Sequence, residues 1–401
     1  MTVIDDPRQA VDNSDLLAGI KLIDVDSHLS EPHDLWTNRA PAKYRDLVPQ
    51  VKERNGRRVW VVDGDIPIGG LGAASVVAPD GGKMLGTGFI RLDIDMVHAA
   101  SHDPVARVEM LDVLGLHAQV MYPNLAGFGN QNFMKVADAD LRLACVQIYN
   151  DAMIEMQQIS GNRLLPMALM PWWDIDASVA ETIRCHEAGL RGVVTCSNPQ
   201  DADLPDLGTD AWDPFWEACI ATEMPVNFHI GSSARDMDWF GQVPWPSFNG
   251  EQKLSVGSAN IFMGNAKVIG NLIFAGVPER FPALKFVSVE SGVGWIPFFL
   301  EALDYQMSET GPNLRDKVPL APSEYFRRNF FGCFWFEKQS LAHVIDTIGV
   351  QSIMFETDFP HPTCLYPKSD ERVRDAISGL DFETRKAILS DNAAKLYKVD
   401  V

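Results

Sequence analysis

Asp26 and His28 stand two residues apart, where a strand-like segment from Leu22 to Val25 gives way to a Pro-containing break. Side chains two apart on a β-strand point to the same face, so the carboxylate and the imidazole would project together from the C-terminal end of the strand. This geometry suits two ligands of one metal ion. An isolated Asp-x-His pair is common by chance, so its weight depends on further ligands downstream.

Three more strand-like segments contain an ionisable group near their C-terminal end: His229 in PVNFHIG, Glu290 in LKFVSVESG and Asp358 in SIMFETDFP. Alone, His229 could be a hydrogen-bonded core histidine and Asp358 a helix cap. Glu290 is harder to explain in that way, because a carboxylate inside an apolar strand is costly to bury unless it is paired or bound to a metal. Two imidazoles and up to three carboxylates are typical of a Zn²⁺, Mn²⁺ or Fe²⁺ site with one or two ions.

These residues would meet only if their strands belong to one sheet. After residue 104 the sequence alternates between helix-like segments, one of them from Ile261 to Phe274, and strand-like segments, which is the pattern of a parallel α/β fold. Eight strand candidates begin with the one around Ile23, and the others lie near residues 118–124, 164–173, 191–199, 225–231, 284–292, 329–336 and 352–360. The pattern predicts a (β/α)8 TIM barrel, in which the C-terminal ends of all strands converge on one face.

The chain divides into a short arm and one domain. Residues 1–20 are predicted to form a polar N-terminal arm and residues 21–401 the barrel. Residues 37–100, approximately, interrupt the alternation, because Asn-Gly and Asp-Gly pairs flank the β-rich RRVWVVD and Gly and Pro then become frequent. We therefore expect a small inserted subdomain of β-hairpins and loops after the first strand.

The composition limits the kinds of partner. The chain has 401 residues, with 34 Lys and Arg against 54 Asp and Glu, so its formal net charge is −20. This charge would repel nucleic acids and anionic membrane surfaces, and neither is expected as a partner. The 6 cysteines form no C-x-x-C pair, and neither a signal peptide nor a long apolar run occurs. The sequence therefore predicts a cytoplasmic protein that acts on a small molecule.

Several segments together carry a resemblance to a known family: DVDSHLSEPHDLW, FHIG, VESGVGWIPFFLEALD, ETDFPH and AILSDNAAKLYKV. In these segments the chain resembles the amidohydrolase-related branch of the amidohydrolase superfamily, over residues 21–399 apart from the insertion. That branch includes metal-dependent aromatic-acid decarboxylases, of the aminocarboxymuconate-semialdehyde decarboxylase type, beside lactonases and other hydrolases. The resemblance implies a metal-dependent enzyme and says little about its substrate.

The resemblance also implies roles for single residues. The family's first pair of metal-binding histidines falls on Asp26 and His28, its strand-five histidine on His229 and its strand-eight aspartate on Asp358. Two departures stand out. An aspartate replaces the first histidine, and Glu290 occupies the place of a strand-six histidine that acts in proton transfer or binds a second metal.

Hydrolysis is the leading functional hypothesis. A metal-bound water of lowered pKa would attack an ester, thioester, lactone or amide carbonyl, with Asp358 as general base. His229 would act at the same centre, and Glu290 would bind a second ion or assist proton transfer. The family's bridging position in strand four falls near residues 194–196, which contain no lysine or carboxylate, so a standard bridged pair of ions is in doubt.

Two alternatives stay open. The first is non-oxidative decarboxylation of an aromatic or unsaturated carboxylic acid, whose carboxylate the metal and Arg39 or Arg235 would hold. Glu290 weakens this interpretation, because a second anion would repel the departing carboxylate. The other alternative is a catalytically inactive barrel that serves as a binding protein, and the intact set of metal ligands argues against it.

Aromatic residues follow several strands, among them Trp172 after the third and Trp335 after the seventh. They predict a mouth that accepts an aromatic or extended apolar group, although such rings can instead pack helices onto the barrel. His361 lies close to Asp358 in the sequence, where it would orient the substrate unless it lies on the surface. The apolar face of GWIPFFLEALDYQM and the inserted segment favour a homo-oligomer, most simply a dimer.

Overall fold

The computed structural model describes residues 16–238 and 244–401. Its centre is a barrel of parallel strands whose side chains are almost all buried. The strands of the barrel are β1 (Leu22–Asp24), β5 (Leu116–Met121), a third strand in two pieces, β6 (Leu164–Pro166) and β7 (Ala168–Leu169), then β8 (Val193–Val194), β9 (Val226–His229), β10 (Phe286–Val289), β11 (Phe330–Phe334) and β12 (Ile353–Phe355). Burial on both faces explains their nearly continuous apolar sequences.

The strands close into a ring, although their ladder hydrogen bonds define two sheets, β1-β5-β6 and β12-β11-β10-β9-β8-β7. At one seam the third strand is interrupted at Met167, whose backbone N donates to the carbonyl of Met121 at 3.0 Å. At the other seam the backbone N of Val25 donates to the carbonyl of Phe355 at 2.9 Å. The predicted (β/α)8 TIM barrel is confirmed.

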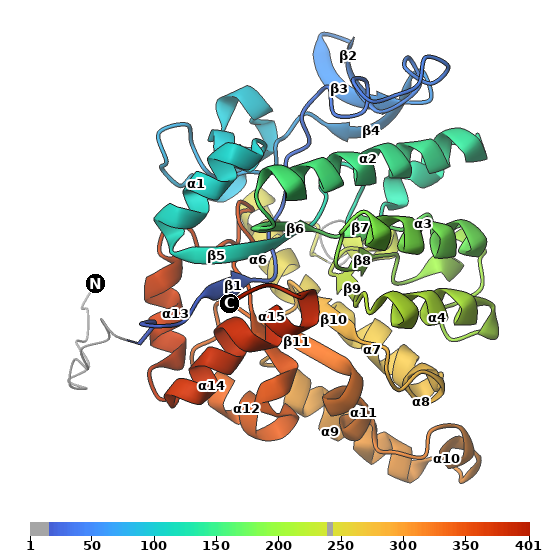
Figure 1. Ribbon diagram of the computed structural model, residues 1–401, viewed down its shortest axis with the longest axis vertical. Coiled ribbons are helices and arrows are strands. Elements are labelled where there is room, and N and C mark those ends of the chain that lie inside the picture. Colours follow the sequence, from blue (N-terminus) through green and yellow to red (C-terminus); the bar gives the residue numbers. More distant parts are fainter. Residues whose placement is uncertain (1–15, 239–243) are drawn as a thin grey trace.

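Helices surround the barrel (Figure 1). They are α1 (Pro104–Leu114), α2 (Ala139–Ile159), α3 (Ile175–Glu187), α4 (Asp213–Thr222), α6 (Gly250–Ile261), α7 (Asn265–Phe274), α8 (Val277–Arg280), α9 (Ile296–Glu309), α10 (Asn313–Lys317), α11 (Pro322–Asn329), α12 (Leu341–Ile348), α13 (Ser369–Ile377), α14 (Phe382–Lys386) and α15 (Asn392–Tyr397). Several begin at aspartate caps, such as Asp103 for α1 and Asp138 for α2, whose carboxylates accept a backbone N–H of the first turn. Gly115, with φ of 69°, ends α1 in a left-handed cap.

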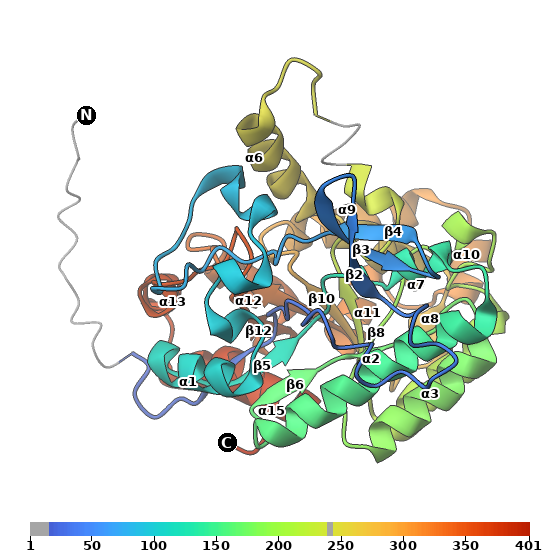
Figure 2. The same ribbon diagram turned by 90° about the horizontal axis from the view of Figure 1, so that it is seen from above.

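An antiparallel sheet follows β1 and precedes α1 in the sequence. Its strands are β2 (Gln50–Arg54), β3 (Arg57–Val62) and β4 (Ile66–Gly70). Asn55 and Gly56 have positive φ values of 52° and 73°, as a tight hairpin turn between β2 and β3 requires. Trp60 packs edge-on against Trp36 with ring centroids 5.9 Å apart, which attaches the sheet to the segment that follows β1. Figure 2 shows α6 protruding from the barrel on the side of this inserted segment.

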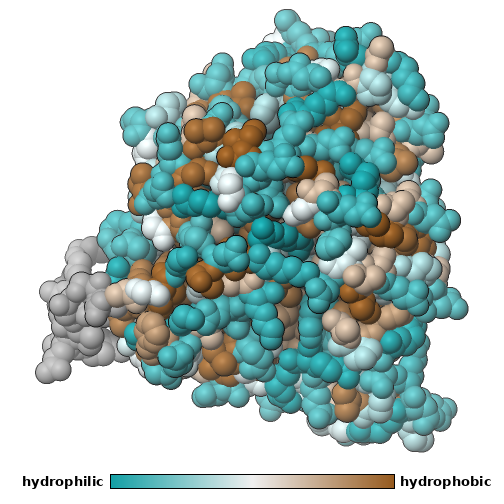
Figure 3. All heavy atoms as spheres, viewed as in Figure 1, coloured by the Kyte–Doolittle hydropathy of each residue, from teal (hydrophilic) through white to brown (hydrophobic). Residues whose placement is uncertain are grey.

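Some elements differ in detail from those the sequence predicts. The helical region expected from Ile261 to Phe274 begins later, because Ile261 is the last residue of α6 and α7 begins at Asn265, whose side-chain N–H donates to the carbonyl of Phe228 at 2.8 Å. The predicted N-terminal arm lies largely outside the described residues; within it, Ile20 is buried in the core. The face in Figure 3 is mainly hydrophilic with scattered hydrophobic patches. Among the described residues, no helix combines the length and apolarity needed to cross a bilayer.

Candidate metal centre

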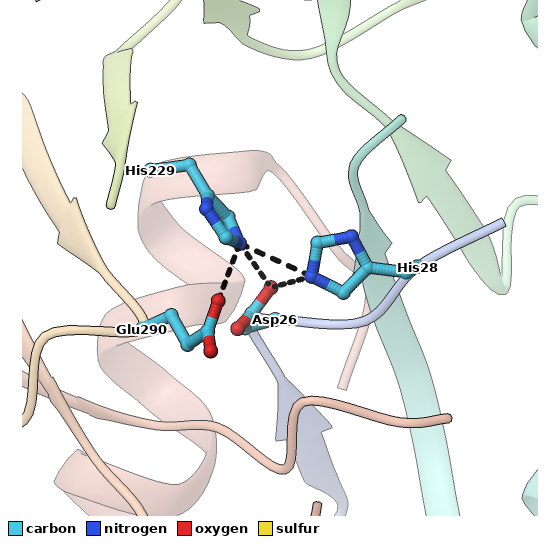
Figure 4. A group of neighbouring side chains, drawn as sticks. All are labelled: Asp26, His28, His229 and Glu290. Atoms are coloured by element: carbon cyan, nitrogen blue, oxygen red, sulfur yellow. Dashed lines mark hydrogen bonds and ion pairs between the residues drawn. The ribbon is translucent and has the colours of Figure 1, made fainter. Parts of the chain in front are cut away.

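Ionisable side chains meet inside the C-terminal end of the barrel, and Figure 4 shows four of them. Asp26 and His28 follow β1, His229 ends β9, Glu290 follows β10 and Asp358 follows β12. All of them are buried, and the most accessible, Glu290, is 8% exposed. The structure thus brings together every residue that the sequence nominates as a metal ligand.

Their ligand atoms lie close to one another. His229 Nε2 lies 3.2 Å from Glu290 Oε2 and 3.5 Å from Asp26 Oδ1. His28 Nε2 lies 3.1 Å from His229 Nε2 and 3.4 Å from Asp358 Oδ1. Imidazole nitrogens and carboxylate oxygens that converge in this way could hold a divalent ion.

The hydrogen bonding of Asp26 and His229 supports the binding of a divalent ion. Both carboxylate oxygens of Asp26 are buried without a hydrogen-bond partner among the described residues. A buried carboxylate in that state is costly, and a cation would compensate it. His229 Nδ1 lies 2.8 Å from the carbonyl oxygen of Ile230, so Nδ1 carries the proton and the lone pair of Nε2 faces the other ligands. The residues present therefore fit a divalent metal ion.

Two of the side chains project from left-handed backbone. Glu290 has φ of 52° and Asp358 has φ of 58°, a region in which residues other than Gly are uncommon. The backbone N of Glu290 donates to Glu356 Oε2 at 3.0 Å, and that of Asp358 donates to the carbonyl of Asp26 at 2.9 Å. Such conformations persist only where the surroundings enforce them, and they concentrate at functional sites.

His361 extends the cluster. Its ring stacks on His28 with centroids 3.6 Å apart, and its Nδ1 lies 2.9 Å from Asp358 Oδ1. Its Nε2 lies 2.7 Å from Asn124 Oδ1, and the amide N of Asn124 donates to the carbonyl of Leu29 at 2.8 Å, which fixes the orientation of the amide. Both ring nitrogens of His361 therefore lie near side-chain oxygen atoms.

Burial and neighbouring charges set the ionisation of the cluster. Burial raises the pKa of the Asp26 and Glu290 carboxyls, and the charges of Asp358 and Asp26 raise that of Glu290 further. Burial lowers the pKa of His28. Burial would also raise the pKa of Asp358, but the charge of His361 and the hydrogen bonds from His28 and His361 hold it well below its usual range. Asp358 is therefore an ionised carboxylate beside His361.

A cavity of about 560 Å³ ends at Glu290 and His361. Its walls are mainly apolar and include Trp60, Ile68, Phe89, Leu125, Phe128 and Ile261. Among the described residues that line it there is no Lys or Arg. A mainly apolar cavity with a few polar groups at one end is typical of a small-molecule site.

Only one of the predicted substrate-binding residues lines this cavity. His361 lines it. The two arginines do not, because each has an acidic partner elsewhere: Arg39 forms an ion pair with Glu155, and Arg235, 77% exposed at its side chain, lies 3.3 Å from Asp201. Within residues 16–238 and 244–401, no arginine lines this cavity.

The two tryptophans also lie outside the cavity lining. Trp172 is buried, and its indole N–H donates to the carbonyl of Gly129 at 2.7 Å. Trp335 is fully buried and packs edge-on against Phe262 with centroids 5.1 Å apart. Both rings pack the loops and helices against the barrel, which is the structural alternative to a role in the substrate mouth.

Several contributors to the site were missed from the sequence. The Phe128 ring lies 4.1 Å from that of His229 and 5.1 Å from that of His28, measured between centroids. Asn124 Oδ1 contacts His361 Nε2. Glu356 accepts a hydrogen bond from the backbone N of Glu290. Asn124 follows the second strand and Glu356 lies in FETDFP, so the convergence of strand ends could have indicated both. Phe128 lies in a Gly-rich loop and carries no comparable signal.

Residues 23–399 match the model of the amidohydrolase family. The chain belongs to the amidohydrolase family. This amidohydrolase-family chain is also similar in structure to an amidohydrolase from Mycobacterium avium subsp. paratuberculosis K-10, with a TM-score of 0.73, 21% identity, and coverage of 94% of this chain and 99% of that one. The predicted family is confirmed.

Two further comparisons bear on the reaction. A gamma-resorcylate decarboxylase from Polaromonas sp. (strain JS666) is 26% identical over 308 residues, which is 73% of this chain and 87% of the relative. A dihydroxybenzoic acid decarboxylase from Polaromonas sp. JS666, solved with bound manganese and the inhibitor 2-nitroresorcinol, has a TM-score of 0.62 and 18% identity, covering 95% of this chain and 97% of that one.

These comparisons contradict the leading functional hypothesis. Hydrolysis was the expected reaction, but the relatives are named as decarboxylases, which was the first alternative. The error came from Glu290, whose negative charge we took to oppose a departing carboxylate. In the structure the Glu290 carboxyl lies 3.2 Å from His229 Nε2 and belongs to a group that also contains His361.

Proposed function

We propose that the protein is a metal-dependent, non-oxidative decarboxylase of an aromatic carboxylic acid. The observation that carries this proposal is the apolar cavity that ends at the ligand cluster and has no Lys or Arg in its lining. A substrate carboxylate that enters it finds positive charge only at the metal centre and at histidine. Membership of the amidohydrolase family and the names of the relatives support the same reaction.

Asp26, His28, His229 and Asp358 would hold the ion, with Glu290 beside them, and Mn²⁺, Zn²⁺ and Fe²⁺ all suit this donor set. When bound, the ion would supply the positive charge that neutralises the substrate carboxylate and an adjacent oxygen. With all three carboxyls ionised, their charges would be balanced by those of a divalent ion and a doubly protonated His361. The substrate anion would then enter a nearly neutral site, which removes the repulsion expected from Glu290.

The chain supplies the proton through His361. As the bond between the ring carbon and the carboxylate breaks, carbon dioxide leaves and the electron pair stays on the ring carbon, which must take up one proton. Nε2 of His361 faces the neutral amide oxygen of Asn124, whereas Nδ1 faces the carboxylate of Asp358, so the Nε2 proton is the one held less strongly. His361 would donate this proton and regain one from solvent.

The test is carbon dioxide release by the manganese-loaded enzyme from a panel of ortho-hydroxy aromatic acids with one or two rings. In D₂O the product should carry one deuterium at the vacated carbon. His361→Gln should lower kcat by about 10²- to 10⁴-fold while its metal content equals that of the wild type. Ester or lactone hydrolysis without carbon dioxide release across the panel would contradict the proposal. An unchanged kcat in His361→Gln would refute the role of His361 alone.

A further inference from the structure

A second cavity, of about 500 Å³, lies at the opposite end of the barrel. Its lining includes Pro225, Lys285, Phe330 and Ser352, which stand immediately before or at the start of β9, β10, β11 and β12. The candidate metal centre lies at the C-terminal ends of three of these strands, β9, β10 and β12. The two cavities are therefore separated by the length of the barrel, and the second has no part in the proposed decarboxylation.

Positive charge is concentrated around this cavity. The ionisable side chains of its lining, apart from the thiol of Cys219, are five basic groups and one acidic group, Lys285, Arg327, Arg328, Lys395, Lys398 and Glu223. The Glu223 carboxylate lies 2.7 Å from Lys398 Nζ and so offsets that lysine. In a chain with a net charge of −20, such a local excess of positive charge is unusual.

Two of these lysines, Lys285 and Lys395, form no salt bridge with any described residue. Lys285 is only partly exposed and donates one hydrogen bond, to the carbonyl of Arg328 at 2.7 Å. Lys395 is exposed and has neither a salt bridge nor a hydrogen bond to any described residue. Burial lowers the pKa of Lys285, and the charges of Arg328 and Lys395 act in the same direction. A bound anion would relieve this repulsion.

The rest of the wall is mainly apolar, with Ile220, Met224, Leu284, Phe331 and Leu396, and also contains the polar side chains of Gln351, Ser352 and Asn392. The cavity also contains the thiol of Cys219, but burial raises its pKa far above neutrality, so it is not a thiolate nucleophile. We propose that this cavity binds an organic anion, with a carboxylate or phosphate between Lys285 and Lys395 and an apolar body against the wall. The site is a binding site without chemistry of its own.

Isothermal titration of the metal-loaded protein with 1-naphthyl phosphate tests the proposal, because this probe joins an apolar body to a dianion. Lys285→Gln should weaken Kd by about tenfold or more, whereas Lys285→Arg should retain most of the affinity. The glutamine can still donate to the carbonyl of Arg328, so a thermal melt close to that of the wild type is expected. Lys43→Gln, the same change at an exposed lysine outside the cavity lining, should leave Kd unchanged.

The other outcomes separate the parts of the proposal. 1-Naphthoate in place of the phosphate tells which head group the site prefers, and uncharged 1-naphthol should bind much more weakly. The proposal fails if the wild type shows no saturable binding, if 1-naphthol binds equally well, or if Lys285→Gln and Lys43→Gln have the same effect. Binding at the metal centre would persist unchanged in Lys285→Gln. If Lys285→Gln does not fold, Lys395→Gln gives the same test at an exposed position.

Discussion

Glu31 supports the metal centre through one intermediate residue. Its Oε1 accepts hydrogen bonds from the backbone N of Asn124 at 2.8 Å and of Leu125 at 3.0 Å, and Asn124 in turn contacts His361. Burial raises the pKa of Glu31 to about 7, although these hydrogen bonds act in the opposite direction. Near neutral pH its carboxyl is therefore partly protonated in the folded chain and ionised in the unfolded chain.

The pH dependence of stability should reveal this residue. Because the folded pKa of Glu31 is raised, its proton contributes stability that is complete below the unfolded pKa of 4.5 and is lost as the pH rises through about 7. The loss amounts to roughly 3 kcal/mol at most. Urea unfolding in EDTA should show the advantage of the wild type over Glu31→Gln shrinking by that amount between about pH 4 and about pH 8. A constant difference over this range would contradict the assignment.

Residue types at the metal centre could be predicted because burying an ionisable group inside an apolar strand is expensive. His229 and Glu290 therefore stand out in the sequence. The direction of a side chain beyond a strand end is not encoded in this way. Trp172 turns toward the carbonyl of Gly129, and Arg235 pairs with Asp201 from another loop, so neither placement follows from local sequence.

At the scale of the element, the ends of β10 and β12 position two of the candidate ligands. β10 and β12 both end shortly before a residue in left-handed backbone, Glu290 and Asp358. The alternation of helix and strand could be read from apolar periodicity. The start of α7 at Asn265 could not, and the side chain of Asn265 contacts Phe228, which lies 37 residues earlier in the sequence. Long-range contacts of this kind decide where an element stops.

The backbone at Glu290 should be strained for any residue with a Cβ. We expect Glu290→Gly to exceed Glu290→Ala in free energy of unfolding by about 1 kcal/mol, because both lack the carboxylate and only Ala carries a Cβ at φ of 52°. Urea unfolding of the metal-free proteins measures the difference. The same two substitutions at Val289, inside β10, provide the control, since Gly should be the less stable there. Equal or reversed stabilities at position 290 would show that the strain is absent.

At the scale of the whole molecule, the ligands lie in one half of the barrel, which runs from β9 through β12 to β1. They come from β1, β9, β10 and β12, and β1 and β12 form the seam at which the ring closes. The dimer stays a prediction; on α9, Phe298 and Tyr305 are 77% and 60% exposed and offer a surface that a second copy could cover. The ligand set is therefore complete only when β1 has closed against β12.

Metal binding should therefore stabilise the whole fold. An ion that binds only the folded chain adds about 2.7 kcal/mol to the free energy of unfolding at 100 times its Kd. Urea unfolding with and without Mn²⁺, after dialysis against EDTA, measures this gain. Asp26→Asn keeps the side-chain shape and should lose most of it, because both oxygens of Asp26 lack other partners. Asp346→Asn, at an exposed position on α12, should keep it. An equal gain in both variants, or none in the wild type, would place the ion elsewhere.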